Sequence, residues 1–172
     1  TAALFAGGYG GTYQAVNESW NGTSWTEVAD LNAAIAGVAG AGTNTSALSF
    51  AGFNPSNPNG SVTNESWNGS AWTEVNDLNN KRFDSNSSRQ SSTSALYFAG
   101  FDSAMRAYTE EWNGTSWTET TDLSAVKSDL GGAGGGSTSA IAFGGRTPPN
   151  NPSTTTEEFT SPTTSTVTFT VS

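Results

Sequence analysis

Residues 18–28 read ESWNGTSWTEV, and the pattern returns as ESWNGSAWTEV at residues 65–75 and as EWNGTSWTET at residues 111–120. The first Trp of each copy recurs after 47 and then 45 residues. A fourth copy begins at Glu158-Phe159 and then diverges. A fixed period of this length indicates a repeat protein, in which each unit buries its apolar face against its neighbours.

Each copy contains Asn-Gly between two strand-like runs, which favours a two-residue type I′ hairpin turn. With Asn21 and Gly22 as the turn, Glu18 pairs with Trp25 across the hairpin. Strand alternation then places Trp20 and Trp25 on one face. The same prediction applies to the later pairs, Trp67 with Trp72 and Trp112 with Trp117. We interpret these six residues as structural, because they recur at the repeat period.

A second unit precedes each hairpin. It reads TSALSFAG at residues 45–52, TSALYFAG at 93–100 and TSAIAFGG at 138–145, with a shifted copy, AALFAGG, at 2–8. Following its Phe through positions 5, 50, 98 and 143 gives steps of 45, 48 and 45 residues. The chain therefore divides into four repeats, approximately residues 1–34, 35–82, 83–127 and 128–172.

Each repeat is expected to form four antiparallel strands. In the second repeat these are a Gly-rich strand at 35–42 and strands at 46–51, 62–67 and 70–75. Small residues suit an inner strand near an axis, whereas Trp fills the wider space between outer strands. The pair Asp-Leu, which follows the first Trp of each hairpin by ten residues, is expected to end the outer strand.

The order of these features resembles the kelch repeat: an apolar strand that ends in paired glycines, then an aromatic residue, then a Trp. The glycine pair is present as Gly7-Gly8 and Gly144-Gly145 and is Ala-Gly in the two middle repeats. The resemblance covers nearly the whole chain and implies an all-β fold, a small β-propeller of about four kelch-like blades. One blade would be incomplete or shared between the chain ends.

Ring closure is left open by the strand count, because the chain begins within a blade. Residues Ser165 to Ser172 alternate apolar and Thr residues and are the natural fourth outer strand. Three accounts remain: a four-bladed ring with one three-stranded blade, a larger ring built by two chains, or the end of a longer propeller. The first is favoured.

Composition narrows the function. The net charge is −9, and the six basic residues form no cluster, which argues against nucleic-acid partners and anionic membrane surfaces. Seventeen apolar residues never occur in a row, which argues against insertion into membranes. The chain has no Cys and no His. It therefore lacks the usual ligands for zinc, copper and iron and the commonest general base. We expect no enzyme activity and no cofactor, and the copper chemistry of kelch-like oxidases is excluded with its His and Cys.

The links between second and third strands are expected to share one rim, where irregular loops suit binding. They carry aromatic, amide and charged side chains that could stack on a sugar ring and bond its hydroxyls. These candidates are Tyr9, Tyr13, Phe53, Asn54, Asn57, Asn59, Asp102, Arg106, Tyr108, Arg146 and Asn150. The opposing interpretation is that they are ordinary turn residues. Five basic residues assigned to the same rim favour an acidic glycan: Lys81, Arg82, Arg106, Lys127 and Arg146.

Two further groups receive structural interpretations. Glu18, Glu65 and Glu111 recur with the repeat and are expected to make a repeated hydrogen bond or to lie at a solvated edge. Oxygen-bearing residues suited to Ca²⁺ gather without a known loop motif at Asp77, Asn79, Asn80, Asp84 and Asn86.

The sequence thus predicts a non-enzymatic recognition or attachment module, extracellular or on a virion surface. Its partner would be a cell-surface glycan or protein, and the chain is expected to self-associate or dock in a larger assembly. The alternative is a purely structural subunit or spacer of a fibre, capsid or tail. A glycosidase is a distant third, because carboxylates repeated by symmetry make weak catalytic pairs.

Overall fold

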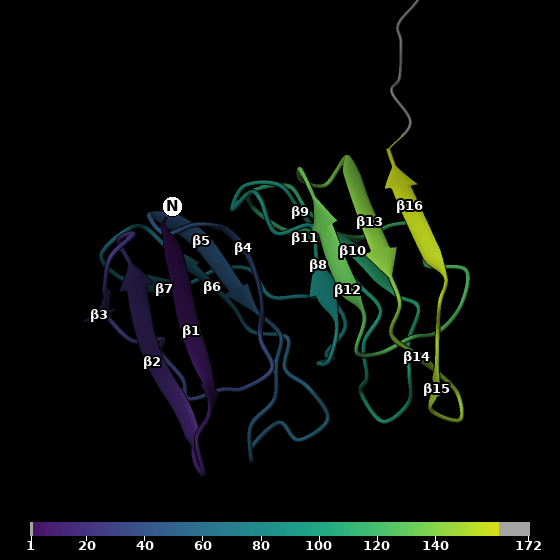
Figure 1. The fold of residues 1–172 in the computed structure, drawn as a ribbon, viewed down its shortest axis with the longest axis horizontal. Coiled ribbons are helices and arrows are strands. Elements are labelled where there is room, and N and C mark those ends of the chain that lie inside the picture. Colours follow the sequence, from purple (N-terminus) through teal and green to yellow (C-terminus); the bar gives the residue numbers. More distant parts are fainter. Residues whose placement is uncertain (1, 162–172) are drawn as a thin grey trace, which may run out of the picture.

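The computed structural model describes residues 2–161, and in this part the chain forms strands, turns and loops without a helix (Figure 1). The predicted all-β class is confirmed. Within the same residues no segment has the helical length and apolar composition of a membrane span. The predicted strand at Ser165 to Ser172 lies outside the described residues.

Four antiparallel sheets follow one another along the chain. The first has the order β1 (Ala3–Tyr9), β2 (Tyr13–Trp20), β3 (Trp25–Val28). The second has the order β4 (Ala39–Thr43), β5 (Ser46–Phe50), β6 (Asn64–Trp67), β7 (Trp72–Glu74). The third has the order β8 (Asn86–Ser87), β9 (Ala95–Phe98), β10 (Thr109–Trp112), β11 (Trp117–Glu119). The fourth has the order β12 (Gly131–Gly134), β13 (Ser139–Phe143), β16 (Thr156–Thr160), and a short hairpin pairs β14 (Arg146–Thr147) with β15 (Asn151–Pro152).

The sheets pack face to face in chain order, and Figure 1 shows the first and fourth on opposite sides of the molecule. At each of the three junctions, the leading sheet supplies aliphatic or Phe side chains from β1, β5 or β9. The following sheet supplies small residues and aromatic side chains, two of them Trp in the second and third sheets. Thus Leu48 and Phe50 belong to one cluster with Ala95, Trp112 and Trp117. No sheet has a core of its own, which is why the units are stable only together.

The predicted two-residue hairpin turn is wrong. Trp20 lies directly opposite Trp25, and Glu18 lies opposite Glu27, so the loop holds four residues. The side-chain carbonyl of Asn21 accepts hydrogen bonds from the backbone N–H groups of Thr23 and Ser24, at 2.9 and 3.0 Å. This Asx turn satisfies the loop locally and competes with the type I′ geometry. The prediction that both Trp side chains share a face is confirmed, with ring centroids 5.6 Å apart.

The alignment of Phe5 with the later Phe residues is also wrong by one position. Ala6 pairs with Asn17 as Phe50 pairs with Asn64, so Ala6 is the structural counterpart of Phe50. Phe5 therefore occupies the opposite face of its sheet, since a shift of one residue along a strand reverses the side chain.

The paired small residues form a tight bend that follows β5, β9 and β13 and that lies within β1 in the first sheet, where the register shifts between Ala6 and Gly8. The first member has a positive φ even where it is alanine: Gly7 has 69° and Ala51 has 62°. The second is glycine throughout, and a Cβ on Gly52 would lie 2.6 Å from the Ala36 carbonyl oxygen. The bend thus needs a residue without a side chain at its second position.

Candidate recognition rim

The loops predicted to share a rim do lie along one edge of the molecule, the lower edge in Figure 1. They follow the glycine bend in each repeat. The Trp hairpins occupy the other edge.

Aromatic rings form a continuous row along this rim. Tyr9 contacts Tyr13 edge to face at 5.2 Å, and Tyr13 contacts Phe53 at 5.8 Å. The row continues through Phe83, 4.6 Å from Phe53, to Phe101 at 5.7 Å. It spans the first three sheets. Tyr9, at its end, is 66% exposed, whereas the other four rings are half-buried.

Sequence reasoning named the first three of these residues and missed Phe83 and Phe101. A signal for Phe101 existed: it follows Gly100 as Tyr9 follows Gly8 and Phe53 follows Gly52. Phe83 has no such marker, because it comes from the segment before an inner strand and meets Phe101 through a backbone bridge.

The predicted amide ligands are turn residues. Asn54 and Asn57 bridge each other across a short turn, and the Asn54 side-chain oxygen accepts backbone hydrogen bonds from Ser56 and Asn57 at 3.1 and 2.9 Å. The Asn54 amide donates to the Ala34 carbonyl. The opposing interpretation, that these residues build the loop, is supported for Asn54. Asn59 is exposed in the same loop.

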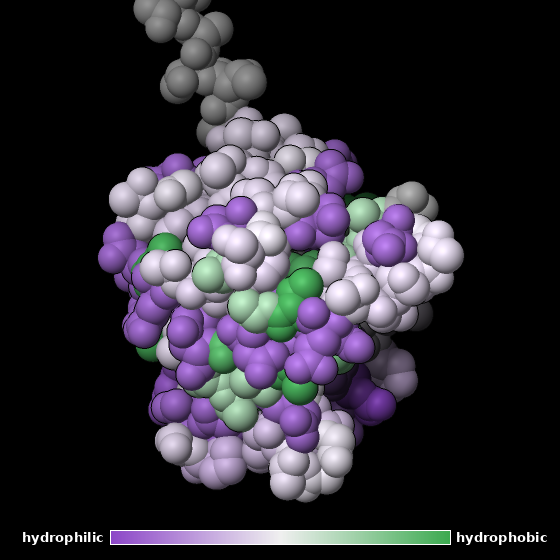
Figure 2. Space-filling view, turned by 90° about the vertical axis from the view of Figure 1, so that its left-hand side faces the viewer, coloured by the Kyte–Doolittle hydropathy of each residue, from purple (hydrophilic) through white to green (hydrophobic). Residues whose placement is uncertain are grey.

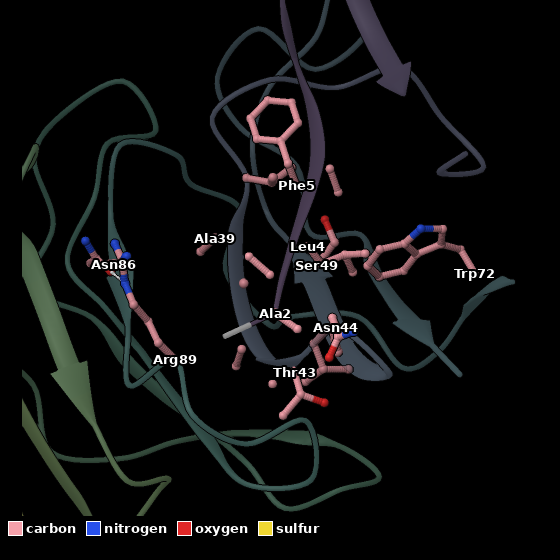
Figure 3. A pocket seen from close by; sticks show the side chains of 18 of the residues that line it. Ala2, Leu4, Phe5, Ala39, Thr43, Asn44, Ser49, Trp72, Asn86 and Arg89 are labelled. Atoms are coloured by element: carbon pink, nitrogen blue, oxygen red, sulfur yellow. Dashed lines mark hydrogen bonds between the residues drawn. The ribbon is translucent and has the colours of Figure 1, made fainter. Parts of the chain in front are cut away.

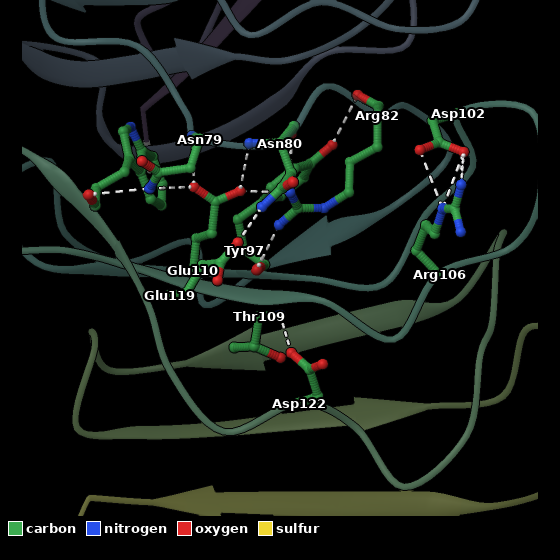
Figure 4. A network of polar contacts seen from close by, with 11 residues as sticks. Asn79, Asn80, Arg82, Tyr97, Asp102, Arg106, Thr109, Glu110, Glu119 and Asp122 are labelled. Atoms are coloured by element: carbon green, nitrogen blue, oxygen red, sulfur yellow. Dashed lines mark hydrogen bonds and ion pairs between the residues drawn. The ribbon is translucent and has the colours of Figure 1, made fainter.

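Asp102, Arg106 and Tyr108 form a group within one loop of the third sheet. The Arg106 guanidinium contacts the Asp102 carboxylate at 2.8 Å (Figure 4). It also lies 5.5 Å from the centre of the Tyr108 ring. Burial disfavours the Asp102 carboxylate, but hydrogen bonds from Arg106 and the Ala104 N–H outweigh it and hold the pKa of Asp102 below its usual range. The ion pair orders the loop and leaves Tyr108 half-buried beside it.

Arg146 and Asn150 lie together on the β14–β15 hairpin. Arg146 donates to the Asn150 side chain at 3.3 Å and lies 3.6 Å from the Asp129 carboxylate. Burial raises the pKa of Asp84, and the charge of neighbouring Asp129 raises it further. Asp84, Asp129 and Arg146 thus lie close together at the junction of the third and fourth sheets.

The assignment of Arg82 and Lys127 to a basic recognition surface is wrong. Arg82 is 0% exposed and Lys127 is 1% exposed. Arg82 forms an ion pair with the fully buried Glu110, and Lys127 contacts the Glu157 carboxylate at 3.0 Å. Both cations form ion pairs where successive sheets meet, so neither is exposed to bind an acidic glycan.

The hydrogen bond predicted to recur with the repeated Glu residues is present in the second, third and fourth sheets. In the third sheet, however, Glu110 makes it and not Glu111 (Figure 4). Glu65 accepts from the Asn32 backbone N–H at 3.0 Å, and Glu110 accepts from that of Asn79 at 2.7 Å. Glu157 accepts from that of Ser124 at 2.7 Å. Each Glu thus binds the chain that enters from the previous sheet. The prediction of Glu111 is wrong, because the strand register matches Glu65 with Glu110: Glu65 lies opposite Ser49 and Glu110 lies opposite Tyr97.

The Ca²⁺ candidates are divided among other contacts. Asn79 and Asn80 donate to Glu110 and Glu119, and the Asn86 amide donates to the Leu130 carbonyl at 2.9 Å. Their side chains serve contacts between the second, third and fourth sheets.

A cavity of about 570 Å³ lies beside β1 and β4 (Figure 3). Leu4, Ala39, Thr43 and Asn86 line it, and the Arg89 side chain also lines it. In the second, third and fourth sheets an inner strand pairs with the strand that corresponds to β1. Among the described residues β1 has no such partner, so its inner edge borders this cavity.

No protein-family model matches the chain, and no curated protein matches its sequence. Among solved structures the chain is similar to one titled "Structure of YjhT", with a TM-score of 0.69 and 12% identity. The match covers 83% of this chain and 48% of that one, so the chain spans about half the length of the neighbour. At this identity the likeness describes the fold alone.

Proposed function

We propose that the four sheets are blades of a kelch-like β-propeller that acts as a non-enzymatic recognition module, and that it binds a cell-surface glycan through the aromatic row. The face-to-face packing of successive sheets and the Trp hairpins support the propeller. The site would be extracellular or on a virion surface.

The observation that carries the function is the row of rings from Tyr9 to Phe101. Inward packing alone does not require a Tyr that is 66% exposed at the end of an aromatic row. The face of such a ring can stack on the C–H surface of a sugar, and neighbouring polar loops can hydrogen-bond its hydroxyls. Because Arg82 and Lys127 are buried and paired with carboxylates, a neutral glycan is favoured over an acidic one.

A glycan array followed by calorimetry on the strongest neutral oligosaccharide tests this proposal. Tyr9→Ala is expected to weaken binding about tenfold, the equivalent of one lost stacking contact of about 1.4 kcal/mol. Trp25→Ala is the matched control, because Trp25 is also an exposed aromatic residue but lies in the Trp hairpin. The proposal fails if no glycan binds, or if both variants weaken binding equally.

A purely structural role is the second candidate, and one observation favours it. Phe5 and Trp25 on the first sheet and Phe143 on the fourth are large apolar side chains that remain exposed. Exposed apolar faces at the two ends of a repeat array suit assembly with other chains.

A further inference from the structure

We propose that the exposed faces of the first and fourth sheets bind each other between two copies of this chain, head to tail, so that two copies close one ring of eight sheets. The inference concerns assembly and does not depend on glycan binding. It rests on the comparison of the two end faces with the three junctions inside the chain.

We call the face of a sheet that packs against the preceding sheet its receiving face, and the opposite face its leading face. The receiving face of the first sheet carries the same residue positions as the buried receiving faces of the second and third sheets. Trp25 corresponds to Trp72 and Trp117, since each pairs with the first Trp of its hairpin. Trp72 is 7% exposed and Trp117 is 5% exposed, but Trp25 is 49% exposed. Figure 2 views the side of the molecule on which the first sheet lies in Figure 1 and shows small groups of apolar side chains on a mostly polar surface. Among residues 2–161, the first sheet therefore presents a receiving face without a leading sheet against it.

The leading face of the fourth sheet is open in the same way. Phe143 pairs with Thr156 as Phe98 pairs with Thr109, so the two Phe residues are equivalent. Phe98 is 3% exposed and Phe143 is 45% exposed. Ile141, two residues earlier on the same face, is also exposed, whereas its counterpart Leu96 is buried. A sheet that follows the fourth sheet is missing among the described residues.

The carboxylates show the same asymmetry. Glu65, Glu110 and Glu157 each accept a backbone N–H from the chain that leaves the previous sheet. Glu18 holds the equivalent position, opposite Glu27 as Glu65 lies opposite Glu74. It is half-buried at the end of the array and has the geometry to receive the same contact from a preceding sheet.

A second copy is the occupant these features favour, because it brings both faces at once. Its fourth sheet carries the leading face that the first sheet needs, and its first sheet carries the receiving face. An acidic residue on the leading face does not prevent the contact: Glu158 there corresponds to Glu111, which lies on the leading face of an existing junction. Once one end has bound, the second junction forms within the complex, which strengthens the pair by effective concentration. Heterologous contacts of this kind close into rings when the rotation allows it.

Sedimentation equilibrium and native mass spectrometry on the full chain test the proposal with Phe143→Lys and Trp25→Lys. Each variant alone is expected to be monomeric, because every junction in a pair of identical variants contains one damaged face. Equal unfolding midpoints for the two variants, measured by circular dichroism, check that both are folded.

Mixing the two variants is the decisive step. Phe143→Lys keeps an intact first sheet and Trp25→Lys keeps an intact fourth sheet, so the mixture is expected to form a one-to-one dimer through one sound junction. A wild type that stays monomeric at about 100 µM would overturn the proposal, since a pair with micromolar affinity would then be dimeric. A dimer that mixing fails to restore would show a symmetric interface instead, and open-ended polymers would refute the closed pair.

Discussion

Removal of the buried carboxylate at Glu110 is expected to destabilise the chain more than removal of its counterpart at Glu65. Both accept hydrogen bonds from an Asn of the preceding repeat, Asn79 and Asn32. Only Glu110 also pairs with a buried cation, Arg82, which packs 4.3 Å from the centre of the Tyr97 ring. At the junction of the first and second sheets, the apolar residue Ile35 holds the position of Arg82, since it follows Asn32 by three residues as Arg82 follows Asn79.

The magnitudes follow from these contacts. Glu110→Gln leaves the Arg82 guanidinium buried without its counter-charge, which costs about 3–5 kcal/mol. Glu65→Gln removes hydrogen bonds to a charged acceptor and strands no cation, so about 1.5–3 kcal/mol is expected. Arg82→Met is expected to cost several kcal/mol alone and to recover about 2 kcal/mol when combined with Glu110→Gln.

Urea unfolding of the four variants, followed by Trp fluorescence, gives the free energies of unfolding for this cycle. The total stability of a domain of this size is about 5–15 kcal/mol, so the losses are measurable. The reasoning is refuted if Glu110→Gln costs no more than Glu65→Gln, or if the Arg82 and Glu110 changes are additive. Burial of the pair would then be irrelevant to the junction.

Three further changes test the loops and junctions. Asp84→Asn is expected to raise stability at about pH 7, because a raised pKa means that the charged form of Asp84 destabilises the fold above that pKa. This destabilisation disappears as the pH falls and the carboxyl becomes protonated. The gain in urea midpoint should therefore vanish at about pH 3, below the ordinary pKa of Asp. Burial disfavours the Glu157 carboxylate, yet its hydrogen bonds from Ser124 and Lys127 lower the pKa of Glu157. Its contribution to the free energy of unfolding is present above the pKa of the unfolded chain and is lost as the pH falls through the pKa of the folded chain. Lys127→Met should therefore reduce the loss of stability at acid pH. Gly52→Ala should cost about 2 kcal/mol or more, since φ is +87° and the new Cβ meets a backbone oxygen at 2.6 Å, whereas Gly10→Ala, with nothing within 4 Å, should change the thermal midpoint little.

The repeat, the all-β class and the shared face of the paired Trp residues were all predictable from the sequence. These features depend on period and alternation, which are local properties of the chain. The rim was also predictable as a place, because loops that follow equivalent strands lie at one edge. Its aromatic membership was predicted only where a marker such as Gly52-Phe53 preceded the ring.

The tertiary structure decided the register and the environment of each side chain. The side-chain oxygen of Asn21 stabilises a four-residue turn in place of the expected two-residue turn. A difference of one residue in register makes Ala6, not Phe5, the counterpart of Phe50, and Glu110, not Glu111, the counterpart of Glu65. The sequence predicts Arg82 and Lys127 as surface cations, but the packing of adjacent sheets buries them beside carboxylates from a different repeat. Periodicity records which residues recur, but burial and ion pairing depend on segments about 30 residues apart that meet only when the sheets pack.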